Sequence, residues 1–517
     1  MKERLRSHQK QIVYILTAGL GLCFLITRFL YLDRLPLGMH LDEAGMAYDA
    51  LSLANYGVDR YLKPWPLYLI NYNAGQSSLY AFLCAGLFKL FGYNIWLVRL
   101  PAVFFSFLTL VFGMKLTERI YPDRVFLPLL TGCLVTFCPY FVLSSRFGLD
   151  CNLMLGVSAV FLYFMHTAVE TGETGRYVAA GLSGGILLYT YALSYAILPI
   201  FLLLSVLYVA VVKKFSLKKW ICMGIPMGIL AFPLILVQIV NIFDLPEMRL
   251  GPFTVTRVPH YRASEIGRFR PEYFLSALRH IFVGDNDLFS SIPRIWNLYA
   301  VTVLLCVIGI IGVAARLVSD TRKKQFYPMA FPFLWFVTVL FFESHIISKT
   351  YTLNSIFLAT ALLAVAGIHT LSVYGKRFYP VLLLGICGIY ALCSLRFGIF
   401  YFSGRYTENT HPLAYFGLTF PEAVEFIEEH EGLSQKLTFV SERGIFYALS
   451  AQISPYKFDI TGDECIRWHN YWFGSLQEIT DDCNYLVGHY YEEYSEELRQ
   501  AGFSELRGDT WSLFYKE

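Results

Sequence analysis

Long apolar segments recur along the chain and predict its architecture. Most of them extend over 18 residues or more, which lets a helix cross about 30 Å of hydrocarbon. The predicted membrane-spanning helices lie at residues 12–32, 100–118, 125–143, 151–169, 178–194, 195–212, 220–240, 297–315, 327–342, 352–372 and 378–396. The pattern therefore predicts an all-α polytopic membrane protein with eleven spans, the first of which is an uncleaved anchor.

One shorter apolar run, residues 76–91, decides between two topologies. The basic N-terminus is expected in the cytoplasm, where short loops are rich in Lys and Arg. If residues 76–91 lie along the membrane surface, four basic loops also become cytoplasmic. These loops are residues 115–124, 213–219, 316–324 and 376–377. A crossing at residues 76–91 would move all four outside. The charge pattern therefore predicts a juxtamembrane helix, a cytoplasmic N-terminus and an extracytoplasmic C-terminus in the cell membrane.

The C-terminal region differs in character from the rest. After about residue 397, acidic residues outnumber basic ones by more than two to one, and the apolar runs shorten. Helices are expected at residues 422–431 and 492–500, and strands at 436–440, 483–487 and 511–515. We therefore predict a membrane domain over residues 1–396, with outer loops at 33–99 and 241–296, and a small extracytoplasmic α/β domain over 397–517.

Composition agrees with a membrane protein and excludes little else. The chain is 56% hydrophobic and 16% charged, whereas soluble domains carry about 25% charged residues. No phosphate-binding glycine-rich loop is present, and no nucleic-acid partner is expected. Most of the 11 cysteines lie in apolar runs. Cys465 and Cys483 are exceptions, and the sequence leaves open whether they form a disulfide.

Asp42 and Glu43 are the strongest candidates for chemistry. They directly follow the first span, on the side predicted to be extracytoplasmic. An acid pair at a membrane surface could supply a general base and its neighbour, or ligands for a divalent ion. The alternative is a solvated turn or a helix N-cap at Asp42.

Arginines on the same predicted side are candidates for binding phosphate, because a guanidinium binds phosphate bidentately. Arg99 begins a span and could instead be a membrane-edge anchor. Arg146 and Asp150 are four residues apart, which also fits a simple ion pair. The outer loop contains Arg249, Arg257, Arg262, Arg268 and Arg270. This loop fits an anionic head group or a pyrophosphate-like donor, or attachment to lipid without chemistry.

His345 and Lys349 also lie between two spans on this side, where a lone histidine is more often structural. His40, His260 and His280 could join His345 and Glu43 in a metal site, although their spacing carries no metal signature. A bound divalent metal is thus an open alternative.

These segments together resemble the GT-C glycosyltransferases. The similar stretches are Leu41-Asp42-Glu43-Ala44, Gln76 to Tyr80, Phe91-Gly92 with Val98 to Pro101, and Cys138-Pro139 with Ser145 to Asp150. Within this superfamily, the chain is most similar to the branch of protein O-mannosyltransferases and lipid A aminoarabinose transferases. The resemblance covers roughly residues 12–400. Ser77-Ser78-Leu79-Tyr80 departs from the usual proline-containing element, and the β-trefoil insertion of the eukaryotic mannosyltransferases is lacking.

The resemblance implies a reaction. Such enzymes move a sugar from a polyprenyl-phosphate donor to a lipid, glycan or protein acceptor, typically with inversion. Asp42 would then deprotonate the acceptor hydroxyl and Glu43 would orient it. Arg99 would hold the leaving lipid phosphate, helped by Arg146 or by Arg257 and Arg262.

Two other classes of protein remain as alternatives. A transporter or flippase usually carries polar groups at mid-membrane, but few charged residues lie near the centres of these spans. A non-catalytic component of cell-envelope polysaccharide assembly is the second alternative.

Overall fold

The computed structural model describes residues 2–261, 266–285, 289–375, 378–405, 421–441, 443–461, 465–474, 476, 478–489, 491–508 and 511–516, and side chains from residue 11 onward except that of residue 421. The chain forms two compact units. The helical unit comprises Met1–Asp33, Arg99–Leu236 and Arg262–Tyr406, and the mixed unit comprises Arg34–Val98, Val237–Tyr261 and Thr407–Glu517.

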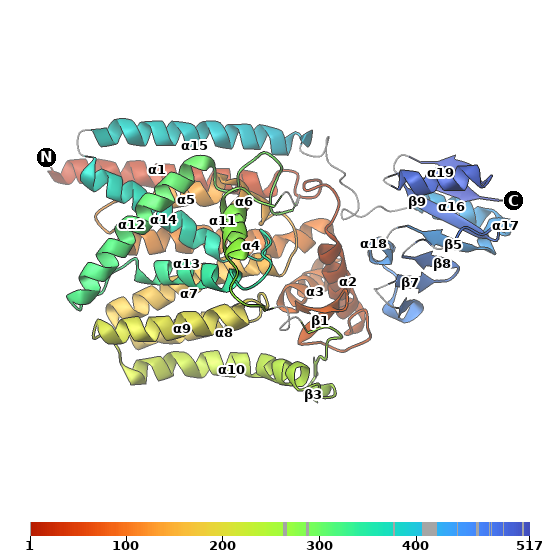
Figure 1. Cartoon of the computed structure of the whole chain (residues 1–517), viewed down its shortest axis with the longest axis horizontal. Coiled ribbons are helices and arrows are strands. Elements are labelled where there is room, and N and C mark those ends of the chain that lie inside the picture. The colour runs from red at the N-terminus through yellow and green to blue at the C-terminus, as the bar shows by residue number, and fades with distance from the viewer. Residues whose placement is uncertain are drawn as a thin grey trace. The chain divides into compact units, whose positions relative to one another are not determined.

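The helical unit is built from helices, most of which are long and apolar (Figure 1). They are α1 (Lys2–Phe29), α4 (Ile95–Ile120), α5 (Leu127–Phe137), α6 (Pro139–Leu143), α7 (Cys151–Thr171), α8 (Thr174–Leu187), α9 (Ser194–Val211), α10 (Leu217–Ile242), α11 (Pro271–Phe282), α12 (Ala300–Arg322), α13 (Ala330–Glu343), α14 (Ile356–Tyr374) and α15 (Tyr379–Phe402). The first residues of α4 and the last of α10 belong to the mixed unit.

Every predicted span coincides with a helix, and within the described residues eight helices are long and apolar enough to cross a membrane. The other three predicted spans coincide with shorter helices. The predicted span at 125–143 is divided between α5 and α6, because Cys138 adopts an extended backbone before Pro139. The chain is thus a multi-pass membrane protein, while the count of eleven crossings stays a prediction.

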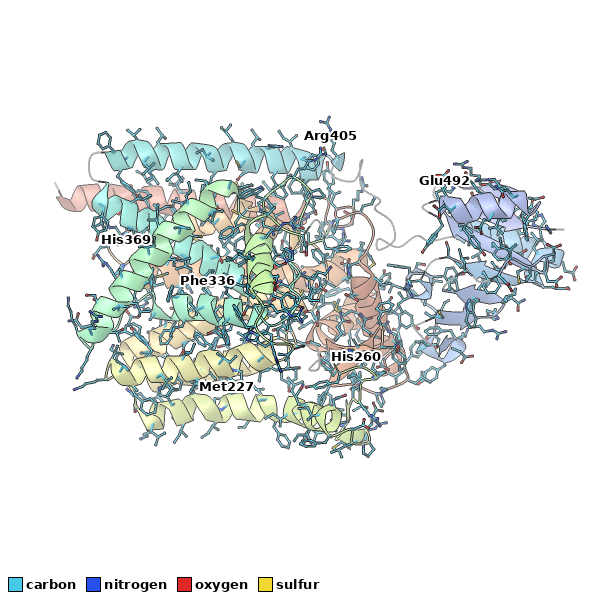
Figure 2. The ribbon with its side chains drawn as sticks, viewed as in Figure 1. Met227, His260, Phe336, His369, Arg405 and Glu492 are labelled. Atoms are coloured by element: carbon cyan, nitrogen blue, oxygen red, sulfur yellow. The ribbon has the colours of Figure 1, made fainter. Side chains whose placement is uncertain are left out.

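The outer surface of the helical unit is apolar, as a lipid environment requires. Large aliphatic side chains project into the surroundings along α10, α12 and α15 (Figure 2). Examples are Ile229, Leu304 and Leu384, which are 69%, 67% and 75% exposed. By contrast, α14 is buried over most of its length and packs closely on α12. A Cβ at Gly367 would lie 2.0 Å from the Leu305 carbonyl oxygen, so only glycine allows this approach.

The N-terminal part of the mixed unit consists of short elements. They are α2 (Leu41–Tyr56), β1 (Tyr68–Asn71), β2 (Ala74–Ser77), α3 (Leu79–Phe91), β3 (Met248–Leu250) and β4 (Phe253–Val255). β1 and β2 form one antiparallel hairpin and β3 and β4 another. The run 76–91, predicted as a juxtamembrane helix, ends β2 and then forms α3. With 13 residues, α3 is too short to cross about 30 Å of hydrocarbon.

The C-terminal part of the mixed unit is an α/β domain. Its seven-stranded sheet has the order β10-β11-β9-β5-β8-β7-β6, with β5 parallel to β8 and β9. The elements are α16 (Pro421–Glu429), α17 (Glu431–Ser434), β5 (Leu437–Val440), α18 (Gly444–Ser450), the 3₁₀ helix η4 (Pro455–Lys457), β6 (Asp459–Thr461), β7 (Cys465–Trp468), β8 (Tyr471–Phe473), β9 (Cys483–Gly488), α19 (Glu492–Gln500), β10 (Ser504–Arg507) and β11 (Trp511–Tyr515). All five predicted elements are present, and β6, β7, β8, β10 and α18 were not anticipated.

The sheet order also answers the cysteine question. Both Cys465 and Cys483 are free. Cys465 lies on β7 and Cys483 on β9, with β8 and β5 between them. Neighbouring strands are about 4.8 Å apart, so the two strands are separated by about 14 Å. A disulfide requires Cα atoms within about 7 Å.

Candidate functional site

The acid pair lies in the first turn of α2, at its N-terminus. The helix begins at Leu41 and its N-cap is His40, not Asp42. The His40 Nδ1 accepts a hydrogen bond from the Asp42 amide at 3.0 Å, and the Glu43 Oε2 accepts one from the His40 amide at 3.3 Å. This reciprocal arrangement is a capping box, with histidine in the place that Ser or Thr usually takes. It fixes both acids at the positive end of the helix dipole.

The two acids have different environments. The Glu43 side chain is fully buried, and its carboxylate closes the capping box. The Asp42 side chain is 37% exposed, and its Oδ1 accepts a hydrogen bond of 2.6 Å from the Asn71 Nδ2. Asn71 ends β1 in the neighbouring hairpin. Asp42 is thus the accessible carboxylate, held in one orientation by Asn71, while Glu43 supports the backbone beneath it.

A buried ion pair joins Asp49, two turns beyond Asp42 on the same helix, to Arg60, which follows the helix in sequence. The Arg60 guanidinium donates to both carboxylate oxygens of Asp49, at 3.0 and 2.8 Å, and each side chain is 1% exposed. The Arg60 amide donates to Asp49 as well. Gly45 makes the approach possible, because a Cβ there would lie 2.5 Å from Arg60 Nη2 and 2.8 Å from Asn71 Oδ1. Arg60 and Asn71 therefore reach α2 at one point, directly above the first turn.

Asp59 is a second buried acid beside this pair. Its Oδ1 accepts hydrogen bonds from the amides of Tyr61 and Lys63 at 2.9 and 2.8 Å. Burial, followed by the charge of Asp49, raises the pKa of Asp59 from 3.8 to about 7. Neither this acid nor the Arg60–Asp49 pair was found from the sequence, because only the tertiary fold brings residues 49, 59 and 60 together. The sequence offered one signal for Asp49, because residues 42 and 49 are seven positions apart and therefore lie on the same face of a helix.

Two of the predicted phosphate-binding arginines are buried in the helical unit. Arg146 donates to the carbonyl oxygens of Thr27, Arg28 and Leu30, at 2.9, 2.9 and 2.6 Å. Arg99 donates to the Leu32 carbonyl oxygen at 2.6 Å. Both guanidiniums thus gather at the C-terminal end of α1 and the turn that follows it, where carbonyl groups lack helical partners.

Arg28 adds a third buried guanidinium that the sequence reading missed, because it lies inside the first predicted span. It donates to the carbonyl oxygens of Val135, Thr136 and Phe141, at 2.7, 2.9 and 2.9 Å. Among the described residues it forms no ion pair. Arg28, Arg99 and Arg146 thus bring three buried guanidiniums into the helical unit.

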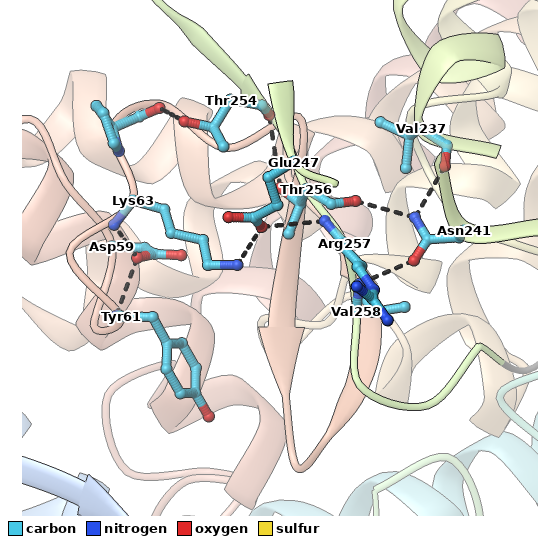
Figure 3. Close-up of polar contacts among 11 residues, drawn as sticks. Asp59, Tyr61, Lys63, Val237, Asn241, Glu247, Thr254, Thr256, Arg257 and Val258 are labelled. Atoms are coloured by element: carbon cyan, nitrogen blue, oxygen red, sulfur yellow. Dashed lines mark hydrogen bonds and ion pairs between the residues drawn. The ribbon is translucent and has the colours of Figure 1, made fainter. Parts of the chain in front are cut away.

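The arginine-rich loop has a different structure (Figure 3). Arg257 forms an ion pair with Asp244, and its amide donates to Glu247 at 3.0 Å. Glu247 in turn pairs with Lys63. The loop is therefore tied together by its own acids, and the Arg257 side chain is 47% exposed. Arg262 lies outside the described residues.

The remaining predicted residues have local roles. Asp150 is the N-cap of α7 and accepts a hydrogen bond from the Cys151 amide at 2.8 Å. The His345 Nδ1 lies 2.9 Å from the Phe341 carbonyl oxygen, and the ring contacts those of Phe269 and Phe341. Lys349 is exposed. Within the part of the chain that the structure describes, no three His, Cys, Asp or Glu side chains gather as metal ligands.

A polar cluster in the helical unit was also missed. Asp285 accepts hydrogen bonds from the Ser291 hydroxyl at 2.9 Å and from the Thr350 amide at 2.7 Å. Fully buried Glu343 accepts one from the Thr352 hydroxyl at 3.2 Å. Burial lowers the pKa of His280, and the charge of Asp285 acts in the opposite direction. The group joins α11 to the segment between α13 and α14.

The chain is similar to one protein family and to solved structures of one membrane protein. A family model described as "Dolichyl-phosphate-mannose-protein mannosyltransferase" matches residues 76–241. The crystal structure of ArnT from Cupriavidus metallidurans bound to undecaprenyl phosphate has a TM-score of 0.53 and 13% identity, with 98% of each chain covered. The apo structure of the same protein gives 0.54 and 14%, again over 98% of each chain. No curated protein sequence matches the chain significantly.

These matches agree with the resemblance found in the sequence. The fold is the GT-C fold of ArnT, with a small C-terminal sheet. The chain resembles the branch that contains ArnT and the protein mannosyltransferases.

Proposed function

We propose that this chain, which has the GT-C fold, moves a sugar from a polyprenyl-phosphate donor to an acceptor hydroxyl at the outer face of the cell membrane. Asp42 is the general base, and the sugar is transferred with inversion. The observation that carries this proposal is the state of Asp42: an exposed carboxylate, oriented by Asn71, on the rigid first turn of an otherwise buried helix. A positioned carboxylate of this kind can take the proton of an attacking hydroxyl.

In this proposal the other site residues have separate tasks. Glu43 is a positioning residue that fixes the first turn through the capping box. The buried guanidiniums of Arg99 and Arg146 stabilise the charge that develops on the leaving phosphate. Arg257 and Arg262 attract the anionic donor to the outer loop. The bound lipid of the ArnT structure, undecaprenyl phosphate, is a donor carrier of the required class.

The side of the membrane rests on charge. The four basic loops predict the ends of the helices that face the cytoplasm, and Asp42 follows the opposite end of the first span. The domain of residues 397–517 is then extracytoplasmic. Labelling of single cysteines introduced at positions 214 and 457 with a membrane-impermeant maleimide tests this arrangement. Only position 457 should react in intact cells.

The central test is turnover by purified Asp42→Asn. The assay supplies a total lipid and cell-envelope extract as the source of both donor and acceptor hydroxyl, and measures released polyprenyl phosphate by mass spectrometry. Loss of a general base lowers turnover by about 10²- to 10⁴-fold, while the melting temperature should stay within the error of the wild type. Asp481→Asn is the matched control, since it neutralises an exposed acid of the mixed unit that the proposal gives no task. Wild-type turnover in Asp42→Asn would show that Asp42 is not the general base, whereas a wild-type protein without turnover would favour a transporter or a non-catalytic assembly component.

Glu43→Gln separates the two acids. Glutamine also closes a capping box, so a purely positional Glu43 predicts that this variant keeps most of its turnover. Repeating the assay after dialysis against a chelator tests the open question of a divalent metal. A metal-dependent reaction loses turnover in the chelator and regains it when a divalent cation is added.

A further inference from the structure

A cavity of about 590 Å³ lies in the helical unit and is lined by residues that are distant in sequence from the acid pair. It is formed where α4, α12 and α14 end, together with the loop that follows α4. Its volume falls in the range of small-molecule binding sites, about 300 to 1,000 Å³. The proposed reaction at Asp42 assigns no role to it.

The chemistry of the cavity is divided between apolar and basic parts. Ile120, Val313 and Ala366 provide apolar walls, and Arg124 and Arg316 contribute guanidiniums. Within the described residues, neither of these two arginine side chains forms a hydrogen bond or an ion pair. Their ten N–H donors are therefore available to a ligand.

His369, in the last turns of α14 (Figure 2), lines the cavity together with these arginines. The charges of both Arg124 and Arg316 act on its ring. The ring lies against Tyr121, with centroids 4.6 Å apart. Its Nδ1 is buried and has no hydrogen-bond partner among the described residues. A buried polar atom without a partner is costly unless water or a ligand satisfies it.

Two acids also line the cavity, and they bear on its specificity. Asp123 and Asp320 belong to the lining, but neither pairs with Arg124 or Arg316 in the described structure. The charges of both Arg316 and Asp320 act on Tyr327, another lining residue. The cavity thus combines guanidinium and carboxylate groups, which suits a head group whose phosphate carries a polar or cationic substituent.

The position of the cavity indicates which kind of ligand it binds. Two of the basic loops that predict the cytoplasmic side, residues 115–124 and 316–324, contribute its lining. The cavity therefore lies at the ends of the spanning helices, at the depth of lipid head groups. We propose that it binds the phosphate-bearing head group of a membrane phospholipid. The phosphate is held by Arg124 and Arg316 beside His369, and the first carbons of the lipid lie against the apolar wall.

The experiment compares the full chain with Arg124→Gln/Arg316→Gln. Native mass spectrometry measures retention of phosphatidylglycerol and phosphatidylethanolamine as each lipid is titrated into the purified protein. The double variant loses the charge-assisted hydrogen bonds that both guanidiniums would donate to the phosphate, so it should bind at least about tenfold more weakly. Arg322→Gln is the matched control, because it removes an exposed arginine of α12 outside the cavity lining.

A second arm distinguishes a lipid from a free phosphate. Inorganic phosphate is compared with chloride at equal ionic strength as a stabiliser of the melting temperature. If phosphate raises the melting temperature and this effect needs both arginines, the ligand is a soluble phosphate. If the protein retains lipid but phosphate does not raise the melting temperature, the ligand is the lipid head group. If neither lipid retention nor phosphate stabilisation changes in the double variant, the proposal is wrong.

A lysine variant guards against loss of folding. Arg124→Lys/Arg316→Lys keeps both charges but not the bidentate geometry, so it should fold and bind with intermediate strength. Because both arms measure binding, they give an answer even if Asp42 proves to have no part in sugar transfer.

Discussion

The buried Arg60–Asp49 pair gives the sharpest test of how the acid pair is held in place. Both side chains are 1% exposed, and two side-chain hydrogen bonds of 2.8 and 3.0 Å join them. Replacing Arg60 by Met leaves the Asp49 carboxylate buried without its counter-charge. Breaking a buried pair in this way costs about 3 to 5 kcal/mol. Since α2 carries Asp42, we expect this cost to appear as opening of the helix.

The structure also predicts an asymmetry between the two partners. In Asp49→Asn the Arg60 charge is left behind, but Asp59 is buried nearby and Arg60 already acts on it. Once Asp49 is neutral, Asp59 can ionise and compensate Arg60. Asp49→Asn should therefore cost less than Arg60→Met. The double variant Arg60→Met/Asp49→Asn removes both charges and keeps an acceptor for the Arg60 backbone amide, so it should recover most of the loss.

Hydrogen exchange of the amides of residues 44–54 measures this opening directly. A loss of 3 kcal/mol corresponds to roughly a hundredfold faster exchange. The expected order of exchange rates is Arg60→Met, then Asp49→Asn, then the double variant, then the wild type. Exchange in Arg60→Met within tenfold of the wild type, or a double variant worse than both single ones, would refute the reasoning.

Two further predictions concern the same unit. The pKa of Asp59 is about 7 in the folded chain against 3.8 for the free group, so its contribution to stability is complete below about pH 3.8 and is lost as the pH rises through 7. Asp59→Asn should therefore raise the melting temperature relative to the wild type more at pH 8 than at pH 5, and an equal difference at both pH values would contradict the assignment. The Tyr48 hydroxyl donates to the Ile453 carbonyl oxygen at 2.6 Å, so Tyr48→Phe should cost about 1 kcal/mol and speed amide exchange in α18. The variant keeps the ring that packs on Phe458 and loses only the hydroxyl. Unchanged exchange in α18 would therefore show that the hydroxyl does not hold this helix.

The sequence predicted the fold well where a single physical signal dominates. Hydrophobic runs mark spans because lipid forces the backbone into helices, and each predicted span coincides with a helix. The C-terminal strands β5, β9 and β11 were found because they are apolar and central or near-central in the sheet. β6, β7 and β8 have only three or four residues each, and β6 and β7 are also partly polar, so these strands carry little pattern.

The site was only partly accessible from the sequence. Asp42 and Glu43 were identified from their position after a span, and the difference between them emerged only from burial and hydrogen bonding. The capping box is visible in retrospect as His40 followed three residues later by Glu43, but histidine is an unusual N-cap. Asn71 and Arg60 reach α2 through tertiary contacts, which spacing along the chain does not encode.

The near-complete burial of α2 has a consequence for how the protein is made. Its residues 43 to 54 are all buried. Part of this burial involves a segment that is 405 positions later in the sequence, where the Ile453 carbonyl oxygen accepts a hydrogen bond from the Tyr48 hydroxyl. Ribosomes add about 5 to 20 residues per second, so about 20 to 80 s separate the synthesis of the two contact surfaces. During this interval the helix that carries Asp42 is incompletely enclosed. We expect the nascent chain to enclose this helix only after the domain of residues 397–517 has been translated. Chains that end before this domain should be substrates for quality-control proteases.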